Sequence, residues 1–267
     1  MKLVKELMHL RGRVALITGG GGHVGAAAAE ALAELGASVA VLDIDRSSCL
    51  RVTRSIKTQY GVPTMPLVVN LSNETATRSV PAQVLRQFGR LDIVVNCAAL
   101  VATSRLKGWT SLFETQRTAA WRKALEVNLT APFVLVQACA KSLAASHHGS
   151  VVNIGSIYGV VGPDLRIYHG TRMGNSAAYA TSKGGVIQLT RWLATVLAPA
   201  IRVNAITCGG VYRNQPRAFV RHYAARTPLK RMATEEDLKG AVAYLASDLS
   251  RYVTGHNLVV DGGWTAW

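Results

Sequence analysis

The sequence predicts one α/β domain, residues 1–267, built on a mostly parallel, seven-stranded, doubly wound sheet with helices on both faces. Three observations support this prediction. Short apolar runs alternate along the chain with longer stretches of helical character. A glycine-rich turn joins the first apolar run to the first of these stretches. No linker, repeat or low-complexity segment divides the chain, whose length suits one α/β domain.

The expected strands are runs of four or five mostly apolar residues, as buried parallel strands require. They are Val14–Thr18, Ser38–Leu42, Pro66–Val69, Leu91–Val95, Val151–Ile154, Ile201–Ala205 and Asn257–Val260. In several of the intervening stretches, apolar side chains recur at helical spacing, as at Leu32 and Leu35. The expected helices are Val24–Leu35, Ser47–Tyr60, Glu74–Phe88, Trp121–Ala144, Ala177–Leu197 and Glu235–Ser247. Strands that alternate with helical crossovers pair in parallel, which places helices on both faces of the sheet.

The composition excludes several classes of protein. Apolar residues make up 49% of the chain and charged residues 17%, which excludes a disordered chain. The four cysteines lie too far apart for a zinc site or a disulfide scaffold, so we expect reduced thiols, no bound metal and a cytoplasmic location. Residues Met1–Arg13 lack the apolar stretch of a signal peptide, and no window reads as a membrane span.

The net charge is unusually positive, because 30 Lys and Arg residues face 15 Asp and Glu residues. Such an excess points to nucleic acid, an anionic membrane or an acidic small molecule as a partner. Between residues 165 and 234 there is no Asp or Glu, whereas 11 residues are Lys or Arg. No nucleic-acid recognition motif, basic helix or aromatic stacking platform accompanies this charge. We therefore expect a small molecule, with neither nucleic acid nor membrane as a partner.

The first expected strand runs directly into the turn Thr18-Gly19-Gly20-Gly21-Gly22-His23-Val24-Gly25, and a helix follows at once. A turn without side chains lets the backbone approach a pyrophosphate closely. The N-terminus of the following helix offers free N–H groups and a positive dipole end. A glycine-rich turn can also be only a tight turn, but its place between the first strand and first helix favours a dinucleotide site.

Asp43 follows the second expected strand and lies 18 residues after Gly25. A carboxylate at this place accepts hydrogen bonds from both ribose hydroxyls and repels a 2′-phosphate, which favours NAD over NADP. The alternative is that Asp43 or Asp45 caps the helix that begins near Ser47, a task for which Asp45 is better placed. Arg46 is close enough to weaken the argument against NADP.

Four polar residues are the candidates for catalysis. Tyr179 and Lys183 are four residues apart and therefore share one face of a helix. A neighbouring ammonium favours the phenolate, which would make the tyrosine a usable acid or base near neutral pH. Ser156 follows the fifth expected strand, and Asn128 lies in the helix before it. Because the carboxyl ends of parallel strands meet along one crevice, Ser156 is placed to converge with a bound cofactor.

In their order and spacing, these motifs resemble those of the short-chain dehydrogenase/reductase family, in its compact single-domain Rossmann branch. The resemblance extends from Arg13 to Gly263. It implies that Tyr179 is the catalytic acid/base, that Lys183 lowers its pKa and binds the nicotinamide ribose, that Ser156 bonds the substrate oxygen, and that Asn128 holds a relay water. It implies cofactor contacts from Thr18, Gly19, Gly22, His23, Val24, Gly25, Asp43, Ile44, Asn70, Leu71, Asn96, Ala98, Tyr179, Lys183, Gly209 and Val211.

Five positions depart from the family's usual pattern. His23 stands at the second glycine of the turn, Asn70 at an aspartate that contacts adenine, and Ala99 at a glycine. Cys208 stands at a proline, and Arg213 at a threonine that often helps to hold the carboxamide. No departure removes a catalytic group, so the activity is still expected.

Two irregular stretches are expected to surround the substrate. Residues 159–176 form an insertion between Ser156 and Tyr179, and residues 212–232 form a lid. The insertion and the tail, Thr254–Trp267, also resemble a subgroup associated with bacterial surface sugars and flagellin glycosylation, which implies a sugar or sugar-nucleotide hydroxyl as the substrate. We expect substrate contacts from Tyr158, Arg166, Arg172 and Arg213, the arginines serving as a clamp for an anionic group. A surface excursion, a subunit contact or a solvated basic face are the alternatives.

The expected function is therefore an NAD(H)-dependent oxidoreductase. It would transfer a hydride between nicotinamide and a CH–OH or ketone substrate of sugar, polyol or sugar-nucleotide type with anionic character. A reductase of 3-oxoacyl thioesters or other small ketones is the alternative within the family. A catalytically silent, cofactor-binding sensor is the alternative of another class. The resemblance also implies a homo-oligomer, a tetramer or a dimer, built on the long helices.

Overall fold

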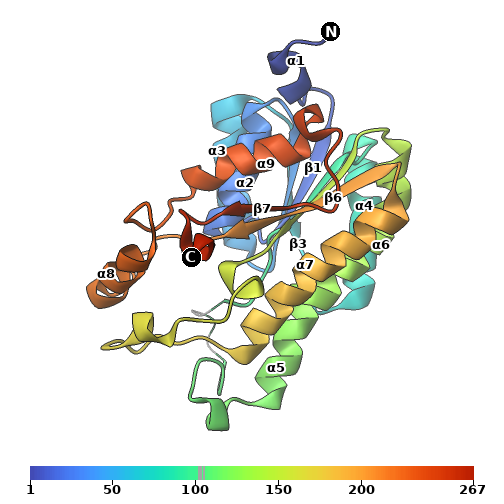
Figure 1. Ribbon diagram of the computed structural model, residues 1–267. Coiled ribbons are helices and arrows are strands. Elements are labelled where there is room, and N and C mark those ends of the chain that lie inside the picture. The colour runs from blue at the N-terminus through green and yellow to red at the C-terminus, as the bar shows by residue number, and fades with distance from the viewer. Residues whose placement is uncertain (102–103, 105) are drawn as a thin grey trace.

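The computed structural model describes residues 1–101, 104 and 106–267, and it has the predicted α/β architecture (Figure 1). All seven strands are parallel and lie in the order β3-β2-β1-β4-β5-β6-β7. The strands are β1 (Val14–Thr18), β2 (Ser38–Asp43), β3 (Thr64–Val68), β4 (Ile93–Asn96), β5 (Gly149–Ile154), β6 (Ile201–Cys208) and β7 (Asn257–Val260). The strand order reverses between β1 and β4. Doubly wound sheets bind ligands at the carboxyl ends of the strands beside such a reversal.

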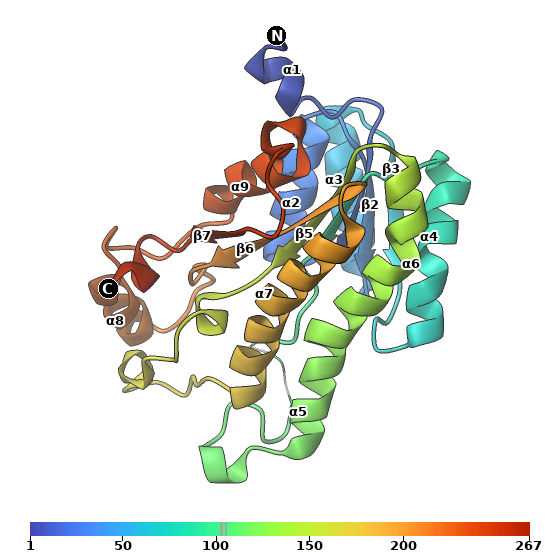
Figure 2. The same cartoon turned by 45° about the vertical axis from the view of Figure 1, so that its right-hand side comes forward.

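Helices cover both faces of the sheet (Figure 2). One face packs against α2 (His23–Glu34), α3 (Arg46–Tyr60) and α9 (Glu236–Ala246). The other face packs against α4 (Glu74–Phe88), α6 (Ala131–Ala145) and α7 (Ala177–Leu197). Successive strand residues point to opposite faces, so Leu16 and Ile17 belong to different apolar clusters. The sheet therefore contributes side chains to two apolar cores, one on each of its faces.

Most predicted bounds agree with the structure to within two or three residues, and β1, β7, α4 and α7 have the predicted bounds. β3 begins at Thr64, two residues earlier than expected, and includes Pro66. A proline is tolerated there because β3 lies at the edge of the sheet. β6 continues to Cys208, past the expected end at Ala205.

The helix expected at Trp121–Ala144 is interrupted. It consists of α5 (Thr118–Leu125), a π-helical turn at Glu126–Thr130, and α6. The N–H of Ala131 donates to the carbonyl of Glu126, five residues earlier, and Pro132 has no N–H to continue the usual pattern. The wider turn contains Asn128 and sets the direction of its side chain.

Two short helices were not expected. α1 (Val4–Met8) precedes the sheet, and α8 (Arg217–Arg226) lies inside the stretch expected to be irregular. In α8, the buried side chains of Phe219 and Tyr223 are four residues apart and face inward. The residues between them are polar or small, so the sequence shows only a weak helical pattern there.

One continuous helical segment, Thr118–Ala145, is long and apolar enough to cross a membrane by length and composition alone. Its second half is α6, whose Leu135, Val136 and Leu143 are buried against the sheet. The segment is therefore a core helix of the α/β fold.

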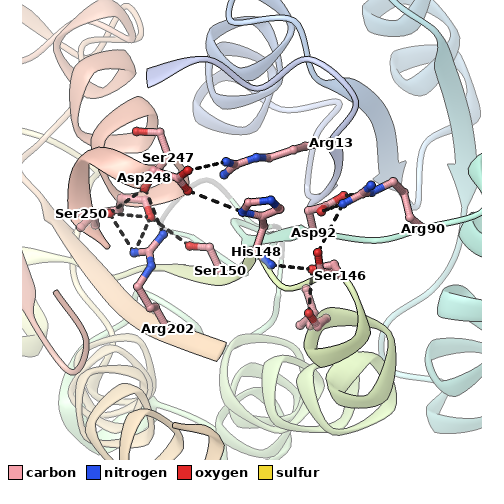
Figure 3. Close-up of polar contacts among 12 residues, drawn as sticks. Arg13, Arg90, Asp92, Ser146, His148, Ser150, Arg202, Ser247, Asp248 and Ser250 are labelled. Carbon is pink, nitrogen blue, oxygen red and sulfur yellow. Dashed lines mark hydrogen bonds and ion pairs between the residues drawn. The ribbon is translucent and has the colours of Figure 1, made fainter. Parts of the chain in front are cut away.

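A polar cluster at the amino ends of the strands ties the end of α9 to the sheet (Figure 3). The Arg202 guanidinium donates to the carbonyls of Leu245 and Ser247, at 3.0 and 3.1 Å, and so caps the carboxyl end of α9. Next to it, the buried Arg13 donates from Nη2 to Asp248 Oδ2 at 2.7 Å. The carboxylate of Asp248 is therefore the group that compensates the charge of the buried Arg13.

Replacing Asp248 with Asn should lower the free energy of unfolding by about 1–3 kcal/mol, because the buried Arg13 loses its counter-ion. Burial raises the pKa of Asp248, but the hydrogen bond from Arg13 and its charge bring this pKa below its ordinary value. The stabilisation is therefore present above the ordinary carboxyl pKa and is lost as the pH falls through the folded-state pKa.

Urea unfolding at about pH 7 and about pH 3 measures both effects, and the Asp248→Asn variant should lose less stability on acidification than the parent protein. Glu74→Gln is the matched control, since Glu74 forms an exposed pair with Arg78 and should contribute under about 0.5 kcal/mol. Equal losses in both variants would contradict the role assigned to Asp248.

Candidate active site

The glycine-rich turn between β1 and α2 is crowded by backbone. Gly19 has a φ of +62°, and a Cβ there would lie 2.7 Å from the Cα of Ala98. A Cβ on Gly25 would lie 2.2 Å from the carbonyl oxygen of Gly19. Gly22 is the N-cap of α2 and supplies no side-chain cap, so the N-terminus of this helix is left open toward a ligand.

This turn forms one end of a cavity of about 650 Å³. Most of the predicted cofactor contacts line it, namely Gly19, Gly22, His23, Val24, Gly25, Asp43, Ile44, Asn70, Leu71, Ala98, Tyr179, Lys183, Gly209 and Val211. Two do not. Thr18 is buried, and its hydroxyl accepts hydrogen bonds from the N–H groups of Cys97 and Ala98, at 3.1 and 3.2 Å. Asn96 donates to Asn153 Oδ1 at 2.8 Å. Both residues hold the ends of neighbouring strands together.

Asp43 reaches the cavity from the end of β2. Its Oδ2 accepts from the N–H of Gly21 at 3.0 Å, and its Oδ1 accepts from the N–H of Asp45 at 3.2 Å. Asp45, as expected, is the N-cap of α3 and accepts from the N–H groups of Ser47 and Ser48. Asp43 is thus free of the capping task and faces the cavity.

Arg51 was missed by sequence reasoning. Its Nη2 donates to the carbonyl of Gly21 at 3.1 Å, so a positive charge lies beside the turn and close to Asp43. Arg51 lies one turn and a half into α3, and only the register of that helix against the turn could have revealed it.

At the other end of the cavity, Ser156 and Tyr179 meet. Ser156 lies two residues after the end of β5, and its Oγ accepts from the N–H of Tyr158 at 3.3 Å. Tyr179 lies in the first turn of α7, where its N–H donates to the N-cap residue Ser176 at 3.1 Å. Both side chains line the cavity, and Ser156 is near enough to lower the pKa of the Tyr179 phenol. The structure thus brings together two of the predicted catalytic residues.

Lys183 lies one helical turn beyond Tyr179 and is 4% exposed. Its Nζ is 5.8 Å from the centre of the Tyr179 ring and donates to the carbonyl of Ile154 at 2.7 Å. Burial lowers the pKa of Lys183. Burial also raises the pKa of Tyr179 to about 12, and the hydrogen bond from Ser156 only partly opposes this. The pKa of Tyr179 thus moves in the direction opposite to the one expected from the sequence, because desolvation of the phenolate is the largest effect on it.

Asn128, in the π-helical turn, is fully engaged with protein groups. Its Oδ1 accepts from the N–H of Leu100 at 2.7 Å, and its Nδ2 donates to the Leu100 carbonyl and to Ser182 Oγ. It is buried and does not line the cavity. Its predicted part in a water relay therefore stays a prediction, and its observed contacts fix the loop after β4.

The insertion and the lid meet over the inner part of the cavity. The hydroxyls of Tyr158 and Tyr168 are 2.8 Å apart, and the Tyr168 ring lies 5.5 Å from that of Phe219 in α8. Together with Met173, these side chains line the cavity. Trp109, from the loop after β4, also lines it and was not predicted. The insertion is thus part of the cavity wall, as expected, and that wall is mainly aromatic.

The three arginines expected to clamp an anion lie in different surroundings. Arg213 lines the cavity. Arg166 is exposed and pairs with Asp164 at 2.8 Å, and Arg172 is exposed outside the cavity lining. A role in substrate binding for Arg166 and Arg172 therefore stays a prediction that the geometry does not support. Among the residues that the structure describes, no group of three His, Cys, Asp or Glu side chains could hold a metal ion.

Comparison with curated proteins finds relatives along the whole chain. A family model described as enoyl-(acyl carrier protein) reductase matches residues 22–265. The cis-4-hydroxycyclohexanecarboxylate dehydrogenase of Sinomonas cyclohexanicum is 34% identical, over 95% of this chain and 97% of that protein. A probable galactose dehydrogenase of Rhizobium meliloti is 34% identical over 95% of each chain. The 3-oxoacyl-[acyl-carrier-protein] reductase of Escherichia coli is 30% identical, over 96% and 98% of the two chains.

Solved structures give the same picture. A short-chain dehydrogenase/reductase from Mycobacterium marinum superposes with a TM-score of 0.88 at 29% identity, over 100% of both chains. An NAD⁺-bound xylitol dehydrogenase has a TM-score of 0.84 at 29% identity, over 95% and 99% of the chains. An NADPH-dependent 3-quinuclidinone reductase from Rhodotorula rubra has a TM-score of 0.87 at 29% identity, over 100% and 96%.

The match to one family over nearly the full length, with the tyrosine, lysine and serine gathered at the strand ends, shows that this chain belongs to the short-chain dehydrogenase/reductase family and acts on CH–OH groups.

Proposed function

We propose that this enzyme is an NAD-dependent dehydrogenase of a small cyclic secondary alcohol of sugar or polyol type. The observation that carries the proposal is the single cavity that has Asp43 at one end and Ser156, Tyr179 and Lys183 at the other. A site for the adenosine ribose and a site for proton transfer thus lie along one continuous surface.

The residues of this cavity fit a nicotinamide dinucleotide. The turn around Gly19 and Gly25 leaves no room for side chains, and the uncapped N-terminus of α2 suits a diphosphate. Asp43 would accept hydrogen bonds from ribose hydroxyls and repel a 2′-phosphate, which supports NAD. Lys183 would bind the other ribose with the donor capacity that Ile154 leaves unused. When bound, the nicotinamide accepts or donates the hydride.

The protein's own part is to hold and move a proton. Ser156 would donate a hydrogen bond to the substrate oxygen and Tyr179 would exchange a proton with it. Because burial raises the pKa of Tyr179 to about 12, the phenol is protonated at neutral pH and is ready to donate to a carbonyl. Alcohol oxidation needs the phenolate. The charge of Lys183 stabilises the phenolate, and solvent is excluded by the aromatic wall.

The cavity also limits the substrate. Its inner part is lined by Trp109, Tyr168, Met173 and Phe219, which suit the flat faces of a ring. The same 650 Å³ must also hold the dinucleotide, so a small substrate fits better than a sugar nucleotide. Two relatives are named for ring compounds, a hydroxycyclohexanecarboxylate and galactose.

We also propose that the substrate has anionic character. Arg172, Arg217 and Arg221 are exposed, and no carboxylate in the described part of the chain pairs with them. Their summed field would attract a carboxylate such as that of the cyclohexane relative's substrate, without a specific contact. The alternative is reduction of a 3-oxoacyl thioester, which the 30% identical reductase of Escherichia coli supports.

The cytoplasmic location and the homo-oligomer expected from the sequence remain part of this proposal. On α7, Trp192 and Val196 are about half exposed, and Trp192 borders a shallow apolar hollow that also includes Phe133 of α6. An apolar helix pair of this kind is suited to pairing with a second copy, in a dimer or a tetramer.

Activity assays with NAD test the function, using galactose-type sugars, hydroxycyclohexanecarboxylates, nucleotide sugars and hydroxyacyl thioesters. We expect a small ring alcohol to be the best substrate, and Tyr179→Phe to lower its kcat by about 10²- to 10⁴-fold with little change in NADH affinity. Tyr212→Phe, on an exposed lid residue, is the matched control. Full activity of Tyr179→Phe would refute the role of the phenol, and a thioester as best substrate would favour the reductase.

Replacing Asp43 with Ala should lower the preference for NAD over NADP by about tenfold or more, measured as the ratio of the two kcat/KM values. The variant removes the repulsion of a 2′-phosphate and leaves Arg51 beside the turn to attract it. Asp45→Ala is the control, since it removes the α3 cap and should cost about 1 kcal/mol of stability without changing the ratio. A parent enzyme that prefers NADP would overturn the assignment of Asp43.

The pH profile should follow the Tyr179 phenol. Since its raised pKa of about 12 must be crossed to form the phenolate, alcohol oxidation should accelerate with rising pH through the alkaline range. Ketone reduction should not show this increase, because the phenol is already protonated. Ser156→Ala removes a hydrogen bond that lowers the pKa of Tyr179, so the oxidation profile of that variant should move to higher pH. An unshifted profile would exclude this coupling.

A further inference from the structure

Arg213 differs from the other arginines of the lid. Within the residues that the structure describes, it is the only arginine that lines the main cavity. It therefore places a full positive charge in the cavity wall. The mechanism above makes no use of that charge.

The backbone holds Arg213 firmly at the base of the lid. Val211 forms a β-bridge with Ala233, and the N–H of Tyr212 donates to the Ala233 carbonyl at 2.8 Å. The N–H of Arg213 itself donates to Gln215 Oε1 at 2.6 Å. The bridge joins the two ends of the lid, and these contacts hold the backbone in place at Arg213.

The side chain of Arg213 is linked to the glycine-rich turn through Glu235, the residue that precedes α9. Glu235 Oε1 lies 4.0 Å from Arg213 Nε and 3.0 Å from His23 Nδ1. His23 is the first residue of α2. One carboxylate thus bridges the lid base and the helix end that faces the diphosphate site, and it brings the guanidinium to that side of the cavity.

The charge of Arg213 reaches the floor of the cavity. Burial raises the pKa values of the Cys97 and Cys208 thiols, and the charge of Arg213 opposes this at both. These cysteines follow β4 and end β6, on either side of β5. The same charge lowers the pKa of Tyr179, against the larger effect of burial, so the field of Arg213 extends over the strand ends and to the catalytic end of the cavity.

We propose that Arg213 binds the diphosphate of the dinucleotide, beside the N-terminus of α2. The inference rests on the dinucleotide site proposed above. A planar guanidinium can form two parallel hydrogen bonds with a phosphate, and the first turn of α2 carries no acidic residue that would repel it. The link through Glu235 to His23, the first residue of α2, favours the diphosphate over a substrate carboxylate.

Direct binding measurements test this role without turnover. NADH binding is followed by its fluorescence, and binding of ADP-ribose, which has the diphosphate but no nicotinamide, by calorimetry. Arg213→Thr should raise both Kd values by about 10- to 100-fold, and Arg213→Lys should restore part of the affinity. Added salt should weaken NADH binding more in the parent enzyme than in Arg213→Thr. Arg251→Met, which removes an exposed charge outside both the lid and the cavity lining, should change neither Kd.

The outcomes separate this inference from the proposed function. If Arg213→Thr binds NADH and ADP-ribose within about twofold of the parent enzyme, and only the KM of an anionic substrate rises, Arg213 belongs to the substrate site and the inference is wrong. If the parent enzyme itself binds neither NADH nor ADP-ribose, the proposed function fails and this assignment fails with it. Thermal unfolding of each variant checks that the fold is retained.

Discussion

The buried ammonium of Lys183 constrains the whole catalytic end of this enzyme. A charge that is 4% exposed needs close polar partners, and the carbonyl of Ile154 provides one at 2.7 Å. This contact requires α7 to lie directly over the end of β5. The packing is correspondingly tight, because a Cβ on Gly159 would lie 2.6 Å from the backbone of Lys183, and one on Gly185 would lie 2.8 Å from Leu129. Small residues on both sides of Lys183 let the surrounding segments close around it.

The other parts of the site follow from this arrangement. Since α7 is fixed by Lys183, its first turn brings Tyr179 to Ser156, and the insertion that connects them must fold outward. The outward fold brings Tyr168 against Phe219 of the lid, which closes the inner cavity with aromatic rings. Burial of Lys183 and Tyr179 lowers the pKa of the lysine and raises that of the tyrosine. Both pKa shifts favour the neutral forms, which are the phenol of Tyr179 and the amine of Lys183. Burial therefore opposes the formation of either ion at this site.

The sequence was sufficient for the sheet, because apolar runs and glycine turns are local signals. It was insufficient where contacts between residues far apart in the chain determine the local structure. Asn128, in the π-helical turn, contacts Leu100, 28 residues away, and no local pattern in the sequence shows that contact. α8 is set by its two buried aromatic residues. Tyr179 illustrates the same limit for chemistry, since the sequence shows the neighbouring lysine but not the burial that raises the tyrosine pKa.

The distribution of charge shows why a count along the sequence misleads. The stretch from 165 to 234 has no acid, yet Asp164, Glu235 and Asp237 border it on either side. The chain folds back, so these three carboxylates pair with arginines of the stretch: Asp164 with Arg166 and Arg226, Glu235 with Arg213, and Asp237 with Arg231.

Of these paired arginines, only Arg213 lines the cavity, and its carboxylate is the most distant, at 4.0 Å. A weakly held guanidinium beside an open helix N-terminus keeps most of its capacity to bind an anion. The charge proposed to bind the dinucleotide therefore belongs to one side chain with a loosely held partner, whereas the exposed arginines of the stretch would act on a substrate only through their summed field.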